Sequence, residues 1–311
     1  MVVGSDAVTT ESVVTAAATK PRPLVLALLA EVRPKQWVKN LLVFAALVSA
    51  GMAGEADAAL DAGLAFVCFC LVSSGTYIVN DLLDMTADRL HPTKRYRPIA
   101  AGEVPVAVAR VLGPVLMICG LGVGLLSRWE VSVVAAAYLA VTITYSFRLK
   151  HVPVIDIVAV ASGFALRAIA GIAAINIPIS NWFFILAVFG SLFMVSGKRQ
   201  AESLTMGDQA SAVRSTLATY SDSYLAYLRS VTSGVVLVAY CLWAFEKAAA
   251  TDARIPWFQL SIVPFGVAIL RYALLIDAGR GGAPEDLVFS ERTLQICGVV
   301  WVATFAAGVY L

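Results

Sequence analysis

Charged side chains are scarce in this sequence, and their scarcity excludes most classes of soluble protein. Only 14% of the 311 residues are Asp, Glu, Lys or Arg, whereas about 25% is usual for a soluble domain. Apolar residues make up 59% of the chain, which is the composition of an integral membrane protein. The net charge is only +2, so the overall charge gives no indication of a nucleic-acid partner.

Histidine and cysteine, the usual zinc ligands, are also rare. The chain has two histidines and five cysteines, and every cysteine falls within an apolar segment. Neither His91 nor any cysteine lies at the spacing of a zinc ligand, so a zinc site is not expected. We expect the cysteines to be small buried hydrophobic residues.

Long apolar segments dominate the sequence instead. Nine of them are long enough to cross a bilayer, which takes about 20 mostly apolar residues. They are too long for barrel strands, so we expect an all-α polytopic membrane protein. Residues 1–20 are expected to form a disordered cytoplasmic tail, and residues 21–311 a single transmembrane domain. The nine predicted spans are residues 37–53, 59–79, 104–126, 131–147, 153–175, 181–197, 224–246, 256–276 and 293–311.

Basic residues flank these predicted spans very unevenly. Sixteen Lys and Arg residues lie on one side, and only Arg128, Lys247 and Arg254 lie on the other. Because basic loops stay in the cytoplasm, the amino terminus is predicted to be cytoplasmic and the carboxyl terminus outside. The sequence therefore predicts a multi-pass protein of the plasma membrane, in contact with membrane lipids, whose functional groups face the cytoplasm.

The stretch NDLLDMTAD, residues 80–88, puts three aspartates at the cytoplasmic end of the second predicted span. Asp81, Asp84 and Asp88 are spaced i, i+3 and i+7, which places them on one face of a continuous helix. Three neighbouring carboxylates repel one another and need a cation. Magnesium is the expected one because it prefers oxygen ligands, and Asn80 can add an amide oxygen. The alternatives are a solvated helix end, or ion pairing for folding alone with Arg89, Lys94 or Arg95.

Basic residues surround this motif on the cytoplasmic loops. Magnesium carboxylates with nearby cations are the groups that hold a departing diphosphate, because the cations take up its developing charge. One basic loop alone is more often a topology determinant or a lipid contact, but the loops together favour a polyphosphate site. The candidate substrate-binding residues on the loops and beside the motif are Lys35, Gln36, Lys39, Asn80, Lys94, Arg95, Tyr145, Arg148, Lys150, Lys198, Arg199 and Glu202.

Two further candidate residues lie inside the fifth predicted span. Asp156 and Arg167 are eleven residues apart, about three helical turns, so they lie on the same helix face. A charge as deep as that of Arg167 needs a partner or a water-filled cavity. We therefore expect the two residues either to form a buried pair or to line the substrate cavity.

The stretch NDLLDMTAD resembles the NDxxDxxxD motif of the UbiA-type intramembrane prenyltransferase superfamily. The resemblance implies a UbiA-like bundle of nine helices and a magnesium-bound diphosphate substrate held by the four polar residues of the motif. Most members transfer a prenyl group to an aromatic acceptor and carry a second aspartate-rich motif after the sixth helix. Here that place reads SGKRQAESLTMGD, with Lys198, Arg199 and Glu202 where the family has aspartates.

One branch of the superfamily has loops similar to RPKQWVKN, HPTKRYRPIAAG, YSFRLKHVPVIDI and SGKRQAE. Its members transfer phosphoribosyl from 5-phosphoribosyl-1-diphosphate to decaprenyl phosphate, a step toward the lipid-linked arabinose donor of cell-wall arabinan. Several phosphate groups near one magnesium site would need many cations, in agreement with the basic loops. Two other functions remain open, a prenyltransferase with an aromatic acceptor and a lipid transporter or flippase. The polyprenyl length and the oligomeric state, a homo-oligomer included, also remain open.

Overall fold

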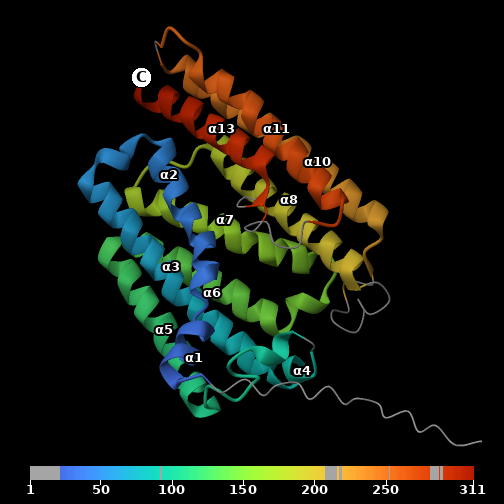
Figure 1. Cartoon of the computed structure of the whole chain (residues 1–311). Helices are drawn as coiled ribbons and strands as arrows, with labels where there is room; N and C mark the ends of the chain where they lie inside the picture. Colours follow the sequence, from blue (N-terminus) through green and yellow to red (C-terminus); the bar gives the residue numbers. More distant parts are fainter. Residues whose placement is uncertain are drawn as a thin grey trace, which may run out of the picture.

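The protein is built from long helices. The computed structural model describes residues 22–91, 93–206, 216, 219–251, 253–280, 287 and 290–311. The expected tail, residues 1–20, lies outside the described residues. Among the described residues the structure is all-helical, as predicted. Eight helices are long and apolar enough to cross a membrane, which makes the chain a multi-pass membrane protein (Figure 1). They are α3 (Ala56–Leu83), α5 (Val106–Ser127), α6 (Trp129–Phe147), α7 (Ile155–Ile175), α8 (Asn181–Met206), α10 (Asp222–Ala249), α11 (Trp257–Asp277) and α13 (Arg292–Tyr310).

The predicted count of nine spanning helices is not confirmed, because the first predicted span is divided. Residues 37–53 fall in the 3₁₀ helix η1 (Pro34–Val43), the short α2 (Phe44–Ser49) and the turn η2 (Met52–Gly54). Together with α1 (Leu24–Glu31), they form a divided segment that packs along α3 and α7 (Figure 1). The described part of the chain therefore contains eight continuous spans and one broken passage along the bundle.

The break in the divided segment has a backbone cause and a side-chain cause. Arg33 has φ 54° and ψ 61°, a left-handed conformation that ends α1, and Pro34 follows it. The polar residues of η1 then find partners inside the bundle. Trp37 Nε1 donates to Ser74 Oγ at 3.1 Å, and the buried Asn40 accepts a hydrogen bond from Arg167. These bonds hold a segment whose own 3₁₀ hydrogen bonds have poor geometry.

Arg167 does not pair with Asp156, which corrects one of the two expectations for these residues. Its Nε lies 2.6 Å from Asn40 Oδ1, its Nη1 2.6 Å from the Gly163 carbonyl oxygen and its Nη2 3.2 Å from the Tyr138 hydroxyl. The guanidinium also lies 4.7 Å from the centre of the Tyr138 ring. Eleven residues of helix separate the two charges by roughly 16 Å along the axis, which is too far for a direct contact.

Small residues allow the closest helix approaches in the bundle. A Cβ at Gly75 of α3 would lie 2.7 Å from the Gly113 carbonyl oxygen of α5, so these two backbones touch. Small residues at interfaces are usual for membrane helices, where close packing has to replace the hydrophobic effect. The expected burial of the cysteines holds for Cys68, Cys70 and Cys297, whereas Cys241 is half-buried and Cys119 is exposed on α5.

The second half of the chain packs as its own layer beside α7. Helices α8, α10, α11 and α13 lie together, and α8 joins them to α7 (Figure 1). Tyr240, Trp243, Phe258, Phe265 and Phe305 fill the space between α10, α11 and α13 with stacked and edge-on rings. This aromatic cluster lies toward the end of the bundle where α10 ends and α11 begins.

Gly171→Ala should displace the divided segment and destabilise the protein. A Cβ at Gly171 of α7 would meet the Val43 carbonyl oxygen at 1.9 Å, and a backbone atom cannot move aside alone. Overpacking of this kind costs about 1–3 kcal/mol of unfolding free energy. Thermal unfolding of the detergent-solubilised protein should show a lower midpoint. The matched control is Gly63→Ala in α3, where nothing lies within 4 Å. An equal midpoint for both variants would contradict this packing.

Candidate active site

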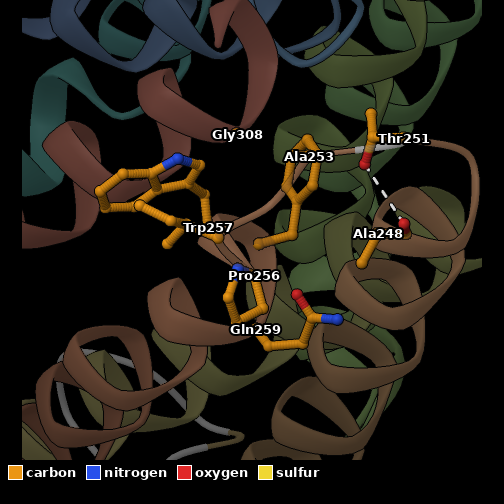
Figure 2. A pocket seen from close by; sticks show the side chains of 9 residues that line it. Ala248, Thr251, Ala253, Pro256, Trp257, Gln259 and Gly308 are labelled. Carbon is orange, nitrogen blue, oxygen red and sulfur yellow. Dashed lines mark hydrogen bonds between the residues drawn. The ribbon is translucent and has the colours of Figure 1, made fainter.

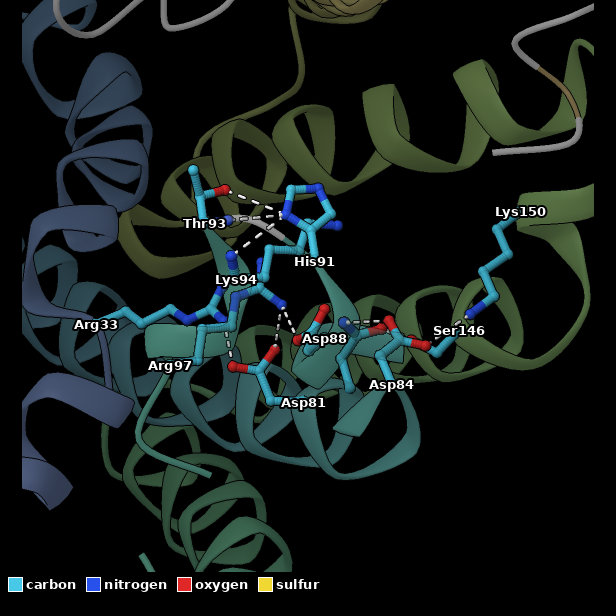
Figure 3. A network of polar contacts seen from close by, with 11 residues as sticks. Arg33, Asp81, Asp84, Asp88, His91, Thr93, Lys94, Arg97, Ser146 and Lys150 are labelled. Carbon is cyan, nitrogen blue, oxygen red and sulfur yellow. Dashed lines mark hydrogen bonds and ion pairs between the residues drawn. The ribbon is translucent and has the colours of Figure 1, made fainter. Parts of the chain in front are cut away.

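The aspartate motif lies where helix α3 ends, and the chain bends inside it. Helix α3 stops at Leu83, Asp84 caps it, and the short α4 (Met85–Leu90) starts with a new direction. The helix is therefore not continuous through the motif, contrary to the expectation from the spacing. Asp81 and Asp88 face Arg97, whereas Asp84 faces Lys150 (Figure 3).

Asp81 and Asp88 are buried carboxylates that share one arginine. Their exposed fractions are 2% and 3%, and Arg97 Nη1 lies 3.1 Å from Asp81 Oδ1 and 2.6 Å from Asp88 Oδ2 (Figure 3). Arg33 forms an ion pair with the other oxygen of Asp81 and lies over the Tyr77 ring at 5.1 Å. Two arginines thus neutralise the two buried acids, because an unpaired carboxylate there would be very costly.

Asp84 has a separate set of partners on its side of the bend. Lys150 Nζ lies 3.1 Å from Asp84 Oδ1, and the Asn80 side-chain amide donates to Asp84 Oδ2 at 3.2 Å. Ser146 donates to Asn80 Oδ1 at 3.1 Å. Lys150 belongs to η4 (Leu149–His151) and Ser146 to the last turn of α6, so this end of α6 closes on the motif.

Glu31 is an additional acid at this site. It ends α1, is 1% exposed, and lies close enough to Asp81 for the two carboxyl groups to interact. Burial, with the negative charge of Asp81 as the second cause, raises the pKa of Glu31 to about 8. Glu31 was not among the candidates, although an acid within the apolar run LVLALLAEV is a signal that could have identified it.

The cations that pair with the buried acids differ from those predicted near the motif. Arg95 packs on Tyr96 instead, at 4.8 Å from the ring. Lys94, in η3 (Lys94–Tyr96), donates its backbone N–H to His91 Nδ1. Arg97 is in reach because the chain turns back through η3. Arg33 is in reach because the break between α1 and η1 lies beside α3, where Ser74 donates to the Val32 carbonyl oxygen.

The predicted residues of the first loop lie on η1, which is a 3₁₀ helix. With three residues per turn, residues i and i+3 lie one above the other. Lys39 therefore lies over Gln36, and its Nζ donates to Gln36 Oε1 at 2.5 Å. Lys35 is exposed at the start of η1.

A second cluster of predicted residues surrounds Arg199 on α8. Arg199 is 2% exposed, and its Nη1 lies 2.7 Å from Glu202 Oε2. Its Nη2 lies 3.5 Å from the Tyr145 hydroxyl of α6, and its Nε lies 3.3 Å from Asp156 Oδ2 of α7. The charge partner that sequence reasoning assigned to Arg167 is thus taken by Arg199.

Two more predicted cations lie on the same elements. Lys198 is half-buried on α8 next to Arg199, and Arg148 is exposed where α6 ends, two residues before Lys150. The end of α6 therefore links the two clusters, because Ser146 contacts Asn80 and Tyr145 contacts Arg199.

The oxygen ligands of the motif suit a hard cation such as magnesium. Their geometry suits a cation that binds together with the substrate. In the described residues, no three His, Cys, Asp or Glu side chains converge on one point as a ready metal site. Magnesium commonly uses one or two carboxylates and completes its shell with substrate phosphates and water. The assignment of Asn80, Asp81, Asp84 and Asp88 to a metal remains a prediction.

A small pocket at the other end of the bundle does not match a phosphate site. Figure 2 shows it between the end of α10, the start of α11 and Gly308 of α13. Its lining includes Thr251, Trp257 and Gln259 but no charged residue. The cationic clusters at the end of α3 and on α8 are the better match for phosphate.

Sequence comparison relates the whole bundle to known enzymes. Residues 42–293 match the UbiA prenyltransferase family. The decaprenyl-phosphate phosphoribosyltransferase of Mycolicibacterium smegmatis is 43% identical, over 93% of this chain and 94% of its own. Its namesake in Corynebacterium glutamicum is 44% identical, over 94% and 89%, and that in Mycobacterium tuberculosis is 41% identical, over 93% and 96%.

Solved structures of distant relatives share the fold. A UbiA homolog from Archaeoglobus fulgidus bound to DMAPP and Mg²⁺ has a TM-score of 0.68, with 16% identity over 91% of this chain and 97% of that chain. A structure of the digeranylgeranylglyceryl phosphate synthase has a TM-score of 0.64, with 17% identity over 92% and 98%. The UbiA-like architecture expected from the aspartate motif is confirmed.

The family assignment thus rests on a match to most of the chain, on relatives of 41–44% identity and on a shared fold. The chain belongs to the UbiA prenyltransferase family, and its relatives at this level of identity are decaprenyl-phosphate phosphoribosyltransferases.

Proposed function

We propose that the protein transfers the 5-phosphoribosyl group of 5-phosphoribosyl-1-diphosphate to a polyprenyl phosphate such as decaprenyl phosphate, with release of diphosphate. The observation that carries the proposal is the 41–44% identity, over almost the whole chain, to relatives with that name. The surplus of cations around the site supports it, because donor and acceptor together bring several phosphate groups. The product would serve as a precursor of the lipid-linked arabinose donor for cell-wall arabinan.

The metal of this reaction would be magnesium, held by the aspartate motif together with the donor diphosphate. Asp84 is the most accessible of the three aspartates, with its side chain 32% exposed, and Asn80 contacts it directly. Bound there, magnesium would neutralise charge on the leaving diphosphate. The distant UbiA homolog bound to Mg²⁺ supports this choice of ion.

The chemistry needs a nucleophile, a leaving group and charge stabilisation. A phosphate oxygen of the lipid attacks C1 of the ribose while the bond from C1 to the diphosphate oxygen breaks, and diphosphate keeps the electron pair. A phosphate monoester is already anionic near neutral pH, so no general base is required. Arg33, Arg97 and Lys150 would shift from the carboxylates toward the phosphate oxygens as negative charge builds on them.

The membrane location would bring the two substrates together. We place the amino terminus and the site on the cytoplasmic side, from the distribution of basic residues, and the carboxyl terminus outside. The donor then arrives from the cytoplasm, while the acceptor keeps its tail in the hydrocarbon and its phosphate at the site. We also propose that residues 21–311 form one transmembrane transferase domain.

The substrate pair can be tested directly with purified protein in lipid nanodiscs. Labelled 5-phosphoribosyl-1-diphosphate, decaprenyl phosphate and magnesium should yield an extractable labelled lipid together with free diphosphate. A parallel reaction with a prenyl diphosphate and 4-hydroxybenzoate tests the prenyltransferase alternative. Prenylated product with no phosphoribosyl lipid would sink the proposal.

Asp84→Asn should remove most of the activity, about a hundredfold or more, because the substitution removes the negative charge with which the carboxylate would hold magnesium. Folding should be preserved, since Asp84 is the most exposed of the three aspartates and lies at a bend. Asp57→Asn is the matched control, on the exposed first turn of α3. Near-normal turnover of the Asp84 variant, with the unfolding midpoint unchanged, would exclude Asp84 as a ligand.

Arg97→Ala and Arg95→Ala should have very different effects. Loss of Arg97 leaves Asp88 buried without its cation, which costs about 3–5 kcal/mol of stability, and should weaken donor binding at least tenfold. Arg95 is exposed and packs on Tyr96, so its loss should change stability by less than about 0.5 kcal/mol. Unfolding midpoints and the donor KM measure both effects. Equal effects would contradict the ion pairing in Figure 3.

A further inference from the structure

Asp156 is a buried carboxylate bonded to two separate parts of the chain. Its side chain, in the first turn of α7, is 0% exposed. The Tyr220 hydroxyl donates to Oδ1, and Thr216 Oγ1 lies 3.3 Å from Oδ2. Arg199 Nε lies 3.3 Å from the same Oδ2. Asp156 is thus fully surrounded by protein and acts on its neighbours rather than on a substrate.

Each of the three guanidinium nitrogens of Arg199 contacts a residue on a different helix. Asp156 of α7 faces its Nε, Glu202 of α8 its Nη1 at 2.7 Å and Tyr145 of α6 its Nη2 at 3.5 Å. The contact at Nη2 is the longest and goes to a neutral oxygen. Nη2 is therefore the donor best placed to exchange its partner for a phosphate oxygen.

The Tyr220 hydroxyl both donates and accepts a hydrogen bond. It donates to Asp156 and accepts the backbone N–H of Val154 at 2.5 Å. Val154 precedes α7 with φ 69° and ψ −48°, an unfavourable conformation for a β-branched residue, so its N–H needs a firm partner. The Tyr220 ring packs among apolar residues and stacks on Tyr224 at 5.7 Å.

The same stretch also contacts the other cationic cluster. Thr216 Oγ1 also lies 3.4 Å from the backbone oxygen of Lys150, so its single O–H is shared between this oxygen and Asp156. Lys150 in turn pairs with Asp84 of the motif. The residues just before α10 thus contact the supports of both Arg199 and Lys150. No candidate residue from the sequence lies in this stretch.

We propose that Tyr220 is a positioning residue for phosphoribosyl transfer, which acts through Asp156 to hold Arg199 with its Nη2 directed to a phosphate of the donor. This inference rests on the proposed function of the site. Tyr220 and Thr216 occupy acceptor positions of Asp156, so Arg199 meets this carboxylate only through Nε. Without them Asp156 can take a bidentate grip on the guanidinium, the strongest geometry for this pair, and turn it away from the substrate.

Tyr220→Phe tests the proposal, with Tyr224→Phe as the matched control on the stacked neighbour. Tyr220→Phe should raise the donor KM about tenfold, as expected for one hydrogen bond to a charged group, and change kcat less than about threefold. The inhibition constant of inorganic diphosphate should rise by a similar factor. Tyr224→Phe should leave both constants within about twofold.

A double-mutant cycle separates positioning from a merely structural role. In an Arg199→Ala background, Tyr220→Phe should change the donor KM less than about twofold, because the group on which it acts is gone. A tenfold change in both backgrounds, or an unchanged KM in the wild-type background, overturns the proposal. Asp156→Asn provides a second variant of the same size and should show the same loss of additivity with Tyr220→Phe.

Failure of this inference can be told apart from failure of the proposed function. Binding of inorganic diphosphate with magnesium is measured by titration calorimetry, independently of turnover. If the wild-type protein makes no phosphoribosyl lipid but Tyr220→Phe still weakens diphosphate binding, the proposed function fails, whereas the positioning of Arg199 for a diphosphate stands. If the wild-type protein makes the lipid and Tyr220→Phe binds diphosphate normally, the positioning role fails.

Discussion

Compensation of buried carboxylates by arginines is the interaction on which the site depends. Asp81, Asp88 and Asp156 are almost completely buried in a membrane protein, where an ionised carboxylate without a partner costs several kcal/mol. Each has an arginine within ion-pair distance, from an element distant in the sequence or across a turn of chain. These pairs hold α4, η3 and α8 against α3 and α7. The groups that would bind phosphate therefore also fold the end of the bundle.

This arrangement explains why a site for highly charged substrates can be stable before they arrive. The carboxylates and the cations neutralise one another, so neither set faces the membrane boundary alone. Under the proposed function, a diphosphate with magnesium would bring both signs of charge and could replace these partners pair by pair, with carboxylates held by the metal and cations held by the phosphate oxygens. Net charge then changes little during binding, which limits the desolvation cost of a site partly enclosed by helices.

The helices and the acidic residues of the site can be predicted from the sequence, but the pairing of these acids with particular basic residues cannot. The span predicted at residues 59–79 is part of the observed Ala56–Leu83, because hydropathy reports a continuous apolar helix well. It failed for residues 37–53, where a left-handed Arg33 and a 3₁₀ turn break the period that hydropathy assumes. Closeness to the motif in sequence favours Lys94 and Arg95 as its partners. Arg97 and Arg33 pair with the acids because of backbone turns that no local pattern encodes, and Tyr220 joins the site through a contact spanning 64 residues.

The divided first segment connects these observations. Asn40 of η1 accepts a hydrogen bond from Arg167 deep in the bundle. Glu31 and Arg33, at the break between α1 and η1, lie beside the aspartate motif. A polar 3₁₀ stretch gains little from contact with lipid, so its position depends on that internal hydrogen bond and on the close approach at Gly171. Arg167 therefore supports the site indirectly, through its hydrogen bond to Asn40, and does not contact the aspartate motif. The buried charge of Arg167 holds η1, and Arg33 lies directly before this helix. The alternative of a cavity-lining role is therefore not needed to explain why an arginine lies at that depth.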